Sequence, residues 1–254
     1  MLLIKDRLNS AGIKQIIRFE WLEKAANFAL SGLSTTEVRK ELHEYLMHRK
    51  GDGSTETRGE TARAQIVNII MKIWIKPDSD LQQFRDTGLE LLRKKGTHLL
   101  PVHWAAVSAA YPFWFNVARL VGRLIRLQGQ VQKQQIDKRL KEQYGDRETI
   151  SRCGRQVVRS FIAWNALSDT TLSGCYEASS PIVVQDTDVV AYLIESALRS
   201  SGEDKLDLSG LLSAPFFFPF RLPTISGSQL KTINSRLEIQ RFAAGEEIVG
   251  IGSP

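Results

Sequence analysis

The sequence predicts a mainly α-helical protein in which winged helix-turn-helix modules with small β-hairpin wings follow a helical N-terminal region. Apolar residues recur at helical spacing, and two short helices separated by Gly145 lead into a β-favouring stretch. The segment 112–165 is also strongly basic. The expected domains are a helical domain over 1–96, a winged-helix DNA-binding domain over 97–185 and a C-terminal α+β domain over 186–254, in the element order of a second winged-helix-like module.

The first two helices are predicted from their ends. An amphipathic pattern covers 16–30 and stops at a Ser-Gly pair. The next helix opens with a capping box, because the hydroxyl of Ser34 and the carboxylate of Glu37 can satisfy free backbone amides at a helix start. This helix is expected to reach about Arg49, where the Gly-containing segment 51–55 breaks it.

Two further N-terminal helices are expected over 60–75 and 79–94. The order of these parts is similar to a helix-turn-helix, in which Arg58 and Arg63 would meet phosphate near a helix N-terminus. Free amides and the helix dipole favour anions there. A plain helical bundle is the alternative, because the loop between the helices is long.

The segment 97–118 has no Lys, Arg, Asp or Glu and is about long enough to cross a bilayer. Pro112 divides it, because proline cannot continue a helix. We therefore expect two buried core helices, Leu100–Ala110 and Pro112–Gln128, and no membrane span. The second carries a row of cations at helical spacing, Arg119, Arg123 and Arg126.

The central winged helix is predicted from three helices over 113–128, 132–144 and 150–164. The turn-rich residues 167–174 and the β-favouring run from Cys175 to Val184 would form its wing. Its core is expected to hold two aromatic side chains, Phe161 and Trp164, against Ile125 and Leu140.

The third of these helices has two opposite faces at about 100° per residue. Its apolar stripe contains Ile150, Val157, Phe161 and Trp164. Its basic face contains Arg152, Arg155 and Arg159. Capping oxygens are expected at its start from Asp146, Thr149 and Ser151.

Double-stranded DNA is the expected partner of the basic face. The predicted DNA-binding residues are Arg147, Thr149, Ser151, Arg152, Arg155, Arg159, Lys133 and Lys138, with Arg58 and Arg63 from the N-terminal region. The alternative is an ordinary solvated helix face, because three arginines on an exposed stripe are common.

The charge distribution favours DNA binding at this place in the chain. Residues 112–165 contain 11 Lys and Arg against 4 Asp and Glu, a net charge of +7, which exceeds the +6 of the whole chain. Residues 166–254 contain 6 Lys and Arg against 11 Asp and Glu, a net charge of −5. Phosphate contacts by Lys and Arg release counterions and supply most non-specific affinity, so nucleic acid is expected at the basic segment.

The C-terminal residues predict helices over 186–200, 207–213 and 226–234, then a hairpin from 237–242 and 246–251. This is again the order of a winged helix, and its acidic charge favours protein contact or packing. The phenylalanine-rich segment 214–220 is expected to be core, and an exposed docking patch is the alternative.

No catalytic pattern supports an enzyme. The sequence has no phosphate-binding glycine loop, no nucleophile elbow and no histidine spacing typical of a metal site, so no cofactor, metal or catalytic residue is expected. Cys153 and Cys175 are expected to be reduced, partly buried thiols. The N-terminus has too short an apolar run for a secretory signal, and a cytoplasmic location is expected.

Residues 16–95 carry one resemblance. An amphipathic helix, the sequence GLSTTEVR over 32–39 and the sequence ETAR over 60–63 opening an Ile-rich helix are similar to the BrxA family of BREX phage-defence systems. The resemblance covers about a third of the chain, which is longer than that family and adds the basic winged helix and the hairpin-ended tail. It implies a small helical DNA-binding component of bacterial antiviral defence, working with other defence-system proteins, and assigns no catalytic residue.

The function expected from the sequence is therefore non-catalytic DNA binding by the basic winged helix, in a bacterial anti-phage defence system. The alternative is a scaffold or adaptor that binds partner proteins through its basic face and its C-terminal module.

Overall fold

The computed structural model describes residues 7–48, 57–94, 99–242 and 245–252. The described chain is mostly helical with small sheets, which confirms the mainly α-helical class. The N-terminal helices are α2 (Phe19–Leu30), α3 (Thr35–Met47), α4 (Glu60–Ile70) with its π-helical continuation η1 (Met71–Ile75), the 3-10 turn η2 (Ser79–Leu81) and α5 (Gln82–Arg93). The predicted capping box of Ser34 and Glu37 is confirmed at the start of α3.

Two further groups of elements follow along the chain. The central group is α6 (Leu99–Ala110), α7 (Pro112–Gln128), β1 (Gln130–Gln132), α8 (Lys133–Tyr144), α9 (Glu148–Ala163), β2 (Leu167–Asp169), β3 (Cys175–Ala178) and β4 (Ile182–Val183). The C-terminal group is α10 (Thr187–Ser201), β5 (Lys205–Asp207), α11 (Leu208–Leu212), η3 (Pro215–Phe217), β6 (Phe220–Arg221), α12 (Gly227–Ile233), β7 (Leu237–Arg241) and β8 (Glu247–Ile251).

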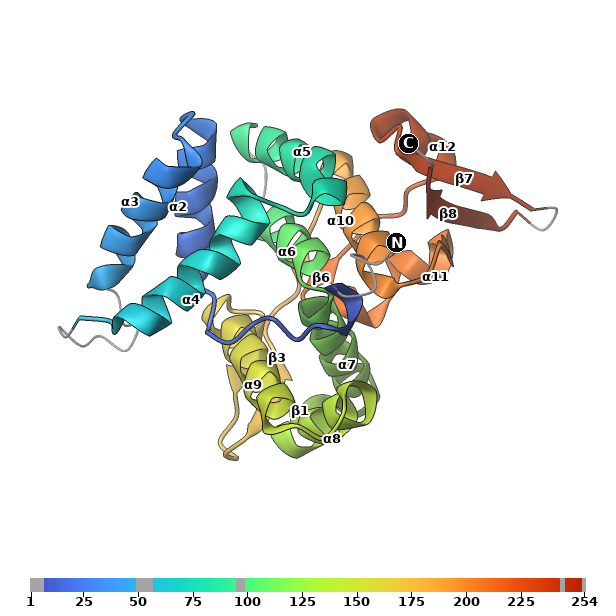
Figure 1. Cartoon of the computed structure of the whole chain (residues 1–254). Helices are drawn as coiled ribbons and strands as arrows, with labels where there is room; N and C mark the ends of the chain where they lie inside the picture. Colours follow the sequence, from blue (N-terminus) through green and yellow to red (C-terminus); the bar gives the residue numbers. More distant parts are fainter. Residues whose placement is uncertain (1–6, 49–56, 95–98, 243–244, 253–254) are drawn as a thin grey trace.

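Helix α6 lies at the centre of the molecule, with α5, α7 and α10 packed around it (Figure 1). All of its residues from Pro101 to Ala110 are buried, which explains the uncharged segment. The predicted division is confirmed, because α6 ends at Ala110 and Pro112 begins α7. No described helix combines the length and apolar character needed to span a membrane. A continuous buried core runs from the N-terminal helices to β8, and the division into three domains stays a prediction.

The phenylalanine-rich segment packs against α7. Phe216, Phe217 and Phe220 are all buried, so its prediction as core is confirmed. Gly122 makes the packing possible, because a Cβ at this position would lie 1.9 Å from the carbonyl oxygen of Pro215. Only a residue without a side chain allows the backbone of η3 to approach α7 this closely.

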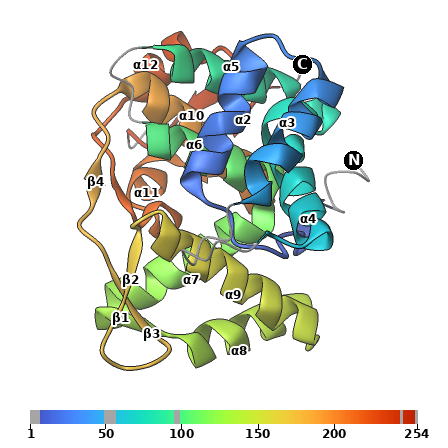
Figure 2. The same cartoon turned by 90° about the vertical axis from the view of Figure 1, so that its left-hand side faces the viewer.

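The same topology occurs twice in succession. In the first copy the order is α7, β1, α8, α9, β2 and β3, and the strands form an antiparallel sheet with the order β1-β3-β2. In the second copy the order is α10, β5, α11, α12, β7 and β8, with η3 and β6 inserted between α11 and α12, and the strands form a sheet with the order β5-β8-β7. The first sheet lies beside α8 and α9 at one end of the molecule, as Figure 2 shows, whereas the β7–β8 hairpin projects from the opposite part in Figure 1.

The sequence-based strand assignment needs three corrections. The hairpin pairs Leu167–Asp169 with Cys175–Ala178, so its first strand lies in the stretch expected to be turn. Ile182 and Val183 are not part of this hairpin, because they pair in parallel with Phe220 and Arg221. The first strand of each three-stranded sheet, β1 and β5, was not predicted. Each has only three residues and pairs with a strand distant in sequence, so it has little local signal.

His103 gives α6 a pH-dependent contribution to stability. Both ring nitrogens are buried without a hydrogen-bond partner among the described residues, and the ring meets Phe19 and Trp74 edge-on. Burial lowers the pKa of His103 from 6.5 to about 3, so the folded protein keeps this ring neutral. Between these values the unfolded chain binds more protons, and the free energy of unfolding is expected to fall by up to about 1.4 kcal/mol per pH unit as the pH decreases.

The variant His103→Phe is expected to make this dependence shallower between pH 6.5 and 4 in urea unfolding followed by circular dichroism, since phenylalanine fills the site without titrating. The exposed His48 provides the control, because His48→Phe should leave the slope unchanged. A wild-type protein whose stability does not change over this interval would contradict the neutral, buried state of His103.

Candidate nucleic-acid interface

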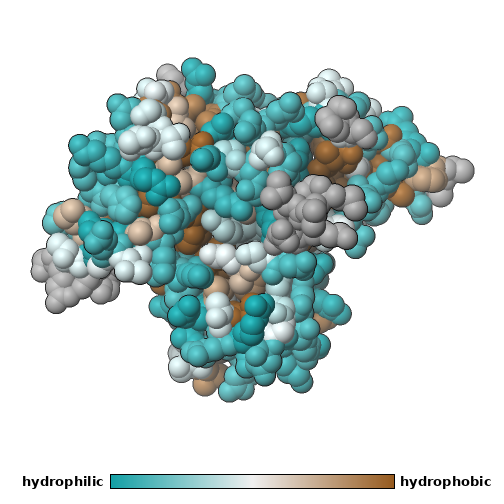
Figure 3. All heavy atoms as spheres, viewed as in Figure 1, coloured by the Kyte–Doolittle hydropathy of each residue, from teal (hydrophilic) through white to brown (hydrophobic). Residues whose placement is uncertain are grey.

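Helix α9 separates a packed face from a basic face, as the sequence indicates. Its buried residues include Ile150, Val157 and Phe161. Its exposed residues include Arg152, Arg155 and Arg159. Helices α8 and α9 pack against each other, and hydrophilic residues cover most of the surface over α7, α8 and α9 in the view of Figure 3.

The packed face of α9 ends in a cluster of aromatic rings. Phe161 stacks on Trp104 with 4.8 Å between the ring centroids and meets Trp114 edge-on at 4.7 Å. Trp164 is also buried, and its indole N–H donates to the carbonyl oxygen of Ile17 at 2.9 Å. The core position of both aromatic residues is therefore confirmed.

The ring contacts of Phe161 involve other aromatic residues, and the predicted packing of Phe161 and Trp164 against Ile125 and Leu140 stays a prediction. Phe161 contacts Trp104, Trp114 and Phe218. Leu140 of α8 lies next to Gly154, about two turns before Phe161 on α9, since a Cβ on Gly154 would be 2.5 Å from the Cδ1 of Leu140. The sequence places Trp104 in a different predicted helix, and only the tertiary structure brings α6 behind α9.

The three arginines of the basic face differ in their local partners. Among the described residues, Arg152 and Arg155 form no ion pair or side-chain hydrogen bond, so their guanidinium groups face solvent with full charge. Arg159 forms an ion pair with Asp169 in β2, at 3.1 Å between Nη1 and Oδ2. The strongest candidates for phosphate or base contact are therefore Arg152 and Arg155.

The predicted capping of α9 is wrong. Arg147 occupies the N-cap and no side chain caps the helix. Asp146 instead pairs with Lys141 at 2.7 Å. Because the helix begins at Glu148, Thr149 and Ser151 lie within its first turn, past the position from which a side chain reaches free amides. Thr149 is exposed, whereas the Ser151 hydroxyl is buried without a partner among the described residues and is not presented to a ligand.

The remaining predicted residues near α9 lie on the surface. Arg147 is exposed, and its Nη2 donates to the carbonyl oxygen of Tyr144 at 3.2 Å. On α8, Lys138 is exposed and Lys133 lies 3.7 Å from Asp137. Lys133 lies near Arg155, because both line one small hollow, and Arg147 lies at the start of α9.

Arg58 and Arg63 belong to a different part of the molecule. Arg58 lies over the ring of Trp21 at 5.1 Å, and its backbone N–H donates to the carbonyl oxygen of Met47. Arg63 on α4 has a buried Nε and lies near His43, whose pKa is lowered by burial and then by the charges of Arg63 and Arg39. In Figure 1 the helices α2, α3 and α4 lie together at the left, above α9. The structure therefore holds these two arginines within the N-terminal helical group.

A second basic surface has no place among the predicted site residues. A groove of about 670 Å³ lies between α7, α8 and η3. It is lined by four arginines, Arg119, Arg123, Arg126 and Arg139. The helical spacing of the first three was visible in the sequence, but Arg139 joins them only through the packing of α8 on α7.

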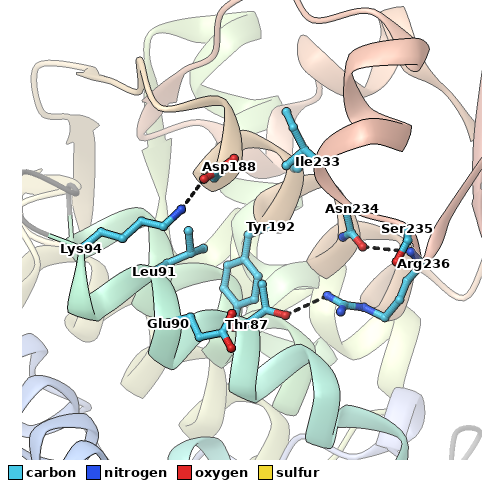
Figure 4. Close-up of a pocket in the computed structure, with 11 residues that line it drawn as sticks. Thr87, Glu90, Leu91, Lys94, Asp188, Tyr192, Ile233, Asn234, Ser235 and Arg236 are labelled. Atoms are coloured by element: carbon cyan, nitrogen blue, oxygen red, sulfur yellow. Dashed lines mark hydrogen bonds and ion pairs between the residues drawn. The ribbon is translucent and has the colours of Figure 1, made fainter.

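A hollow of about 220 Å³ lies between α5, α10 and the segment after α12 (Figure 4). Its charged side chains mostly satisfy one another. Lys94 pairs with Asp188, and Arg236 donates to Thr87 at 3.1 Å and to Glu195 at 2.7 Å. No cluster of three or more His, Cys, Asp or Glu able to hold a metal ion occurs in the part of the chain that the structure describes.

No protein-family model, curated protein or solved structure matches the chain.

Proposed function

We propose that this protein binds double-stranded DNA without catalysing a reaction, and that α9 is the helix that enters the major groove. The observation that carries the proposal is the pair Arg152 and Arg155, which project from a helix whose opposite face is anchored in the core. A groove-reading helix needs this combination, because rigid packing fixes its orientation and free guanidinium groups meet phosphates and base edges.

The arrangement around α9 supports a winged helix as the DNA-binding module. The order helix, strand, helix, helix, strand, strand and the sheet order β1-β3-β2 are those of winged-helix domains, with α8 and α9 as the helix-turn-helix pair and β2–β3 as the wing. The exposed wing turn contains Thr171, Leu172 and Ser173 but no basic residue. Positive charge therefore comes from the helices, and the wing would contribute shape and neutral contacts.

The biological setting rests on the resemblance to the BrxA family alone. On that basis we place the protein in bacterial antiviral defence, where DNA binding would bring other defence-system proteins to a duplex.

Charge reversal on α9 tests DNA binding. Each lost phosphate contact lowers the slope of log K against log salt by about 0.9, so two lost contacts amount to about 1.8 decades of affinity over each decade of salt. The double variant R152E/R155E should therefore bind a fluorescently labelled, mixed-sequence duplex about 60-fold more weakly near 0.1 M salt, relative to a reference near 1 M where the contacts no longer contribute. Fluorescence anisotropy titrations at several salt concentrations measure both quantities. The slope should decrease by about 2.

The control variant K76E/R93E changes the net charge equally at two exposed positions outside 112–165, and it should bind almost as the wild type does. Circular dichroism should show all three proteins folded. Wild-type protein that does not bind duplex at low salt, or R152E/R155E that binds no more weakly than K76E/R93E, would refute the role of α9.

A further inference from the structure

The groove between α7, α8 and η3 is a concentrated patch of unneutralised positive charge. No acidic residue lines it. Among the described residues, Arg119 and Arg123 form no ion pair or side-chain hydrogen bond. Arg126 donates to the carbonyl oxygen of Ser213, and Arg139 pairs with Glu142 at 3.0 Å. The groove therefore presents at least two arginines with their full charge and two more that keep donor groups for a ligand.

The groove also exposes apolar surface between these charges. Leu127 has 73% of its surface exposed, the largest fraction among the described large hydrophobic residues. The partly buried Leu120 and Pro215 and the edge of the largely buried Phe216 also line the groove. Single exposed leucines are common on protein surfaces, but this one lies in a groove beside several arginines, and arginine together with apolar side chains is typical of protein-binding sites.

The groove lies apart from the basic face of α9. The buried side of α8 contains Ile136 and Leu140. A different side of the same helix provides Arg139 and Gln143, which line the groove. The groove takes Arg119, Arg123 and Arg126 from α7, and α9 contributes no residue to it. Two separate basic surfaces on one module are more than one duplex contact through α9 requires.

We propose that this groove binds an acidic amphipathic helix of a partner protein. Arg119, Arg123 and Arg126 have the spacing i, i+4 and i+7, which extends over about 10 Å at 1.5 Å per residue. A partner helix can place carboxylates with the same spacing on one stripe and leucine or phenylalanine on the adjoining stripe. The apolar side decides against a nucleic-acid backbone, because phosphate and sugar offer nothing to cover Leu127. This inference is independent of DNA binding by α9.

A designed peptide is the direct probe. The striped peptide is a fluorescein-labelled helix of about four turns with glutamates at i, i+4 and i+7 and leucines on the neighbouring stripe. A shuffled peptide of the same composition lacks both stripes. In fluorescence anisotropy titrations at low salt, the full-length protein should bind the striped peptide and should bind the shuffled peptide several-fold more weakly.

Two variants separate the charged and the apolar parts of the groove. R119E/R123E should weaken binding of the striped peptide about tenfold, as expected for several exposed charge pairs turned from attraction to repulsion. Leu127→Ser should weaken the striped peptide severalfold and leave the shuffled peptide unaffected, because only the striped peptide covers the leucine. All these side chains are exposed, and circular dichroism verifies that both variants fold. K76E/R93E again controls for net charge.

Three results would overturn the proposal. The first is no binding of the striped peptide at low salt, and the second is equal binding of both peptides, which would mean attraction by net charge alone. The third is a loss of duplex binding in R119E/R123E as large as that in R152E/R155E, which would make the groove part of the DNA site. R152E/R155E should retain the striped peptide, so failure of DNA binding and failure of the groove are distinguishable.

Discussion

Replacing Phe161 with alanine is expected to lower the free energy of unfolding by about 3 to 5 kcal/mol, as is typical for a fully buried aromatic residue. Its ring has no exposed surface and contacts Trp104, Trp114 and Phe218, which belong to α6, α7 and the phenylalanine-rich segment. The deletion leaves a cavity where three parts of the chain meet. Duplex binding should be lost together with the cooperative unfolding transition.

Urea unfolding followed by circular dichroism measures this effect without relying on the tryptophans that contact the deleted ring. Ile162→Ala is the matched control, because Ile162 is the next residue of α9 and is only partly buried. Its cost should be clearly smaller. A Phe161→Ala protein that unfolds at the wild-type urea concentration but no longer binds duplex would mean that the two faces of α9 have been assigned the wrong way round.

The second large effect is expected at Glu195, which lies on α10 with its carboxylate fully buried. Its Oε1 accepts from Arg199 at 2.7 Å, and its Oε2 accepts from Arg236 at 2.7 Å and Asn234 at 2.6 Å. These bonds hold the turn between α12 and β7 against α10. Glu195→Ala would leave two partly buried arginines without their counter-charge, and we expect a loss of about 3 kcal/mol.

Thermal unfolding and limited proteolysis of the C-terminal segment check this expectation. Glu90→Ala, at an exposed position on neighbouring α5, should change stability by less than about 0.5 kcal/mol. Similar melting temperatures for Glu195→Ala and Glu90→Ala would show that the buried network contributes little.

The effect of Glu195→Ala should also depend on pH. Burial raises the pKa of Glu195, but hydrogen bonding from Arg236 and the charges of Arg199 and Arg236 outweigh burial and lower it below 4.5. A depressed acid pKa stabilises the folded protein above the unfolded-state value, and this stabilisation disappears as the pH falls through the folded-state value. The stability difference between wild type and Glu195→Ala should therefore be constant near neutral pH and shrink below about pH 4.5. His103 is present in both proteins, so its titration cancels in the difference.

Local patterns in the sequence predicted much of the fold. The apolar stripe of α9, the uncharged residues of α6 and the capping box of α3 each depend on residues within one or two helical turns, and each appears in the structure. The hairpin of β7 and β8 was predicted for the same reason, because both strands and their turn lie within fifteen residues.

Short strands with distant partners escaped prediction. Strand β1 pairs Gln130–Gln132 with Cys175–Glu177, some 45 residues away, and nothing in three residues of sequence specifies such a partner. The capping of α9 failed for a related reason. Several residues around 146–151 have suitable oxygens, and only the position at which the helix begins, Glu148, decides which of them reach free amides.

The basic residues and the helix faces that they occupy could be predicted from the chain's residues alone, because both follow from composition and a repeat of about 3.6 residues. This repeat places Arg152 and Arg155 on one solvent-facing stripe, as the structure also does. Which charges remain unneutralised and which come together depends on how the helices and strands pack. Asp169 reaches Arg159 through a strand, and Arg139 joins the arginines of α7 through the packing of two helices. Charge interactions depend on distance in space, which the chain sets by packing distant apolar residues into one core.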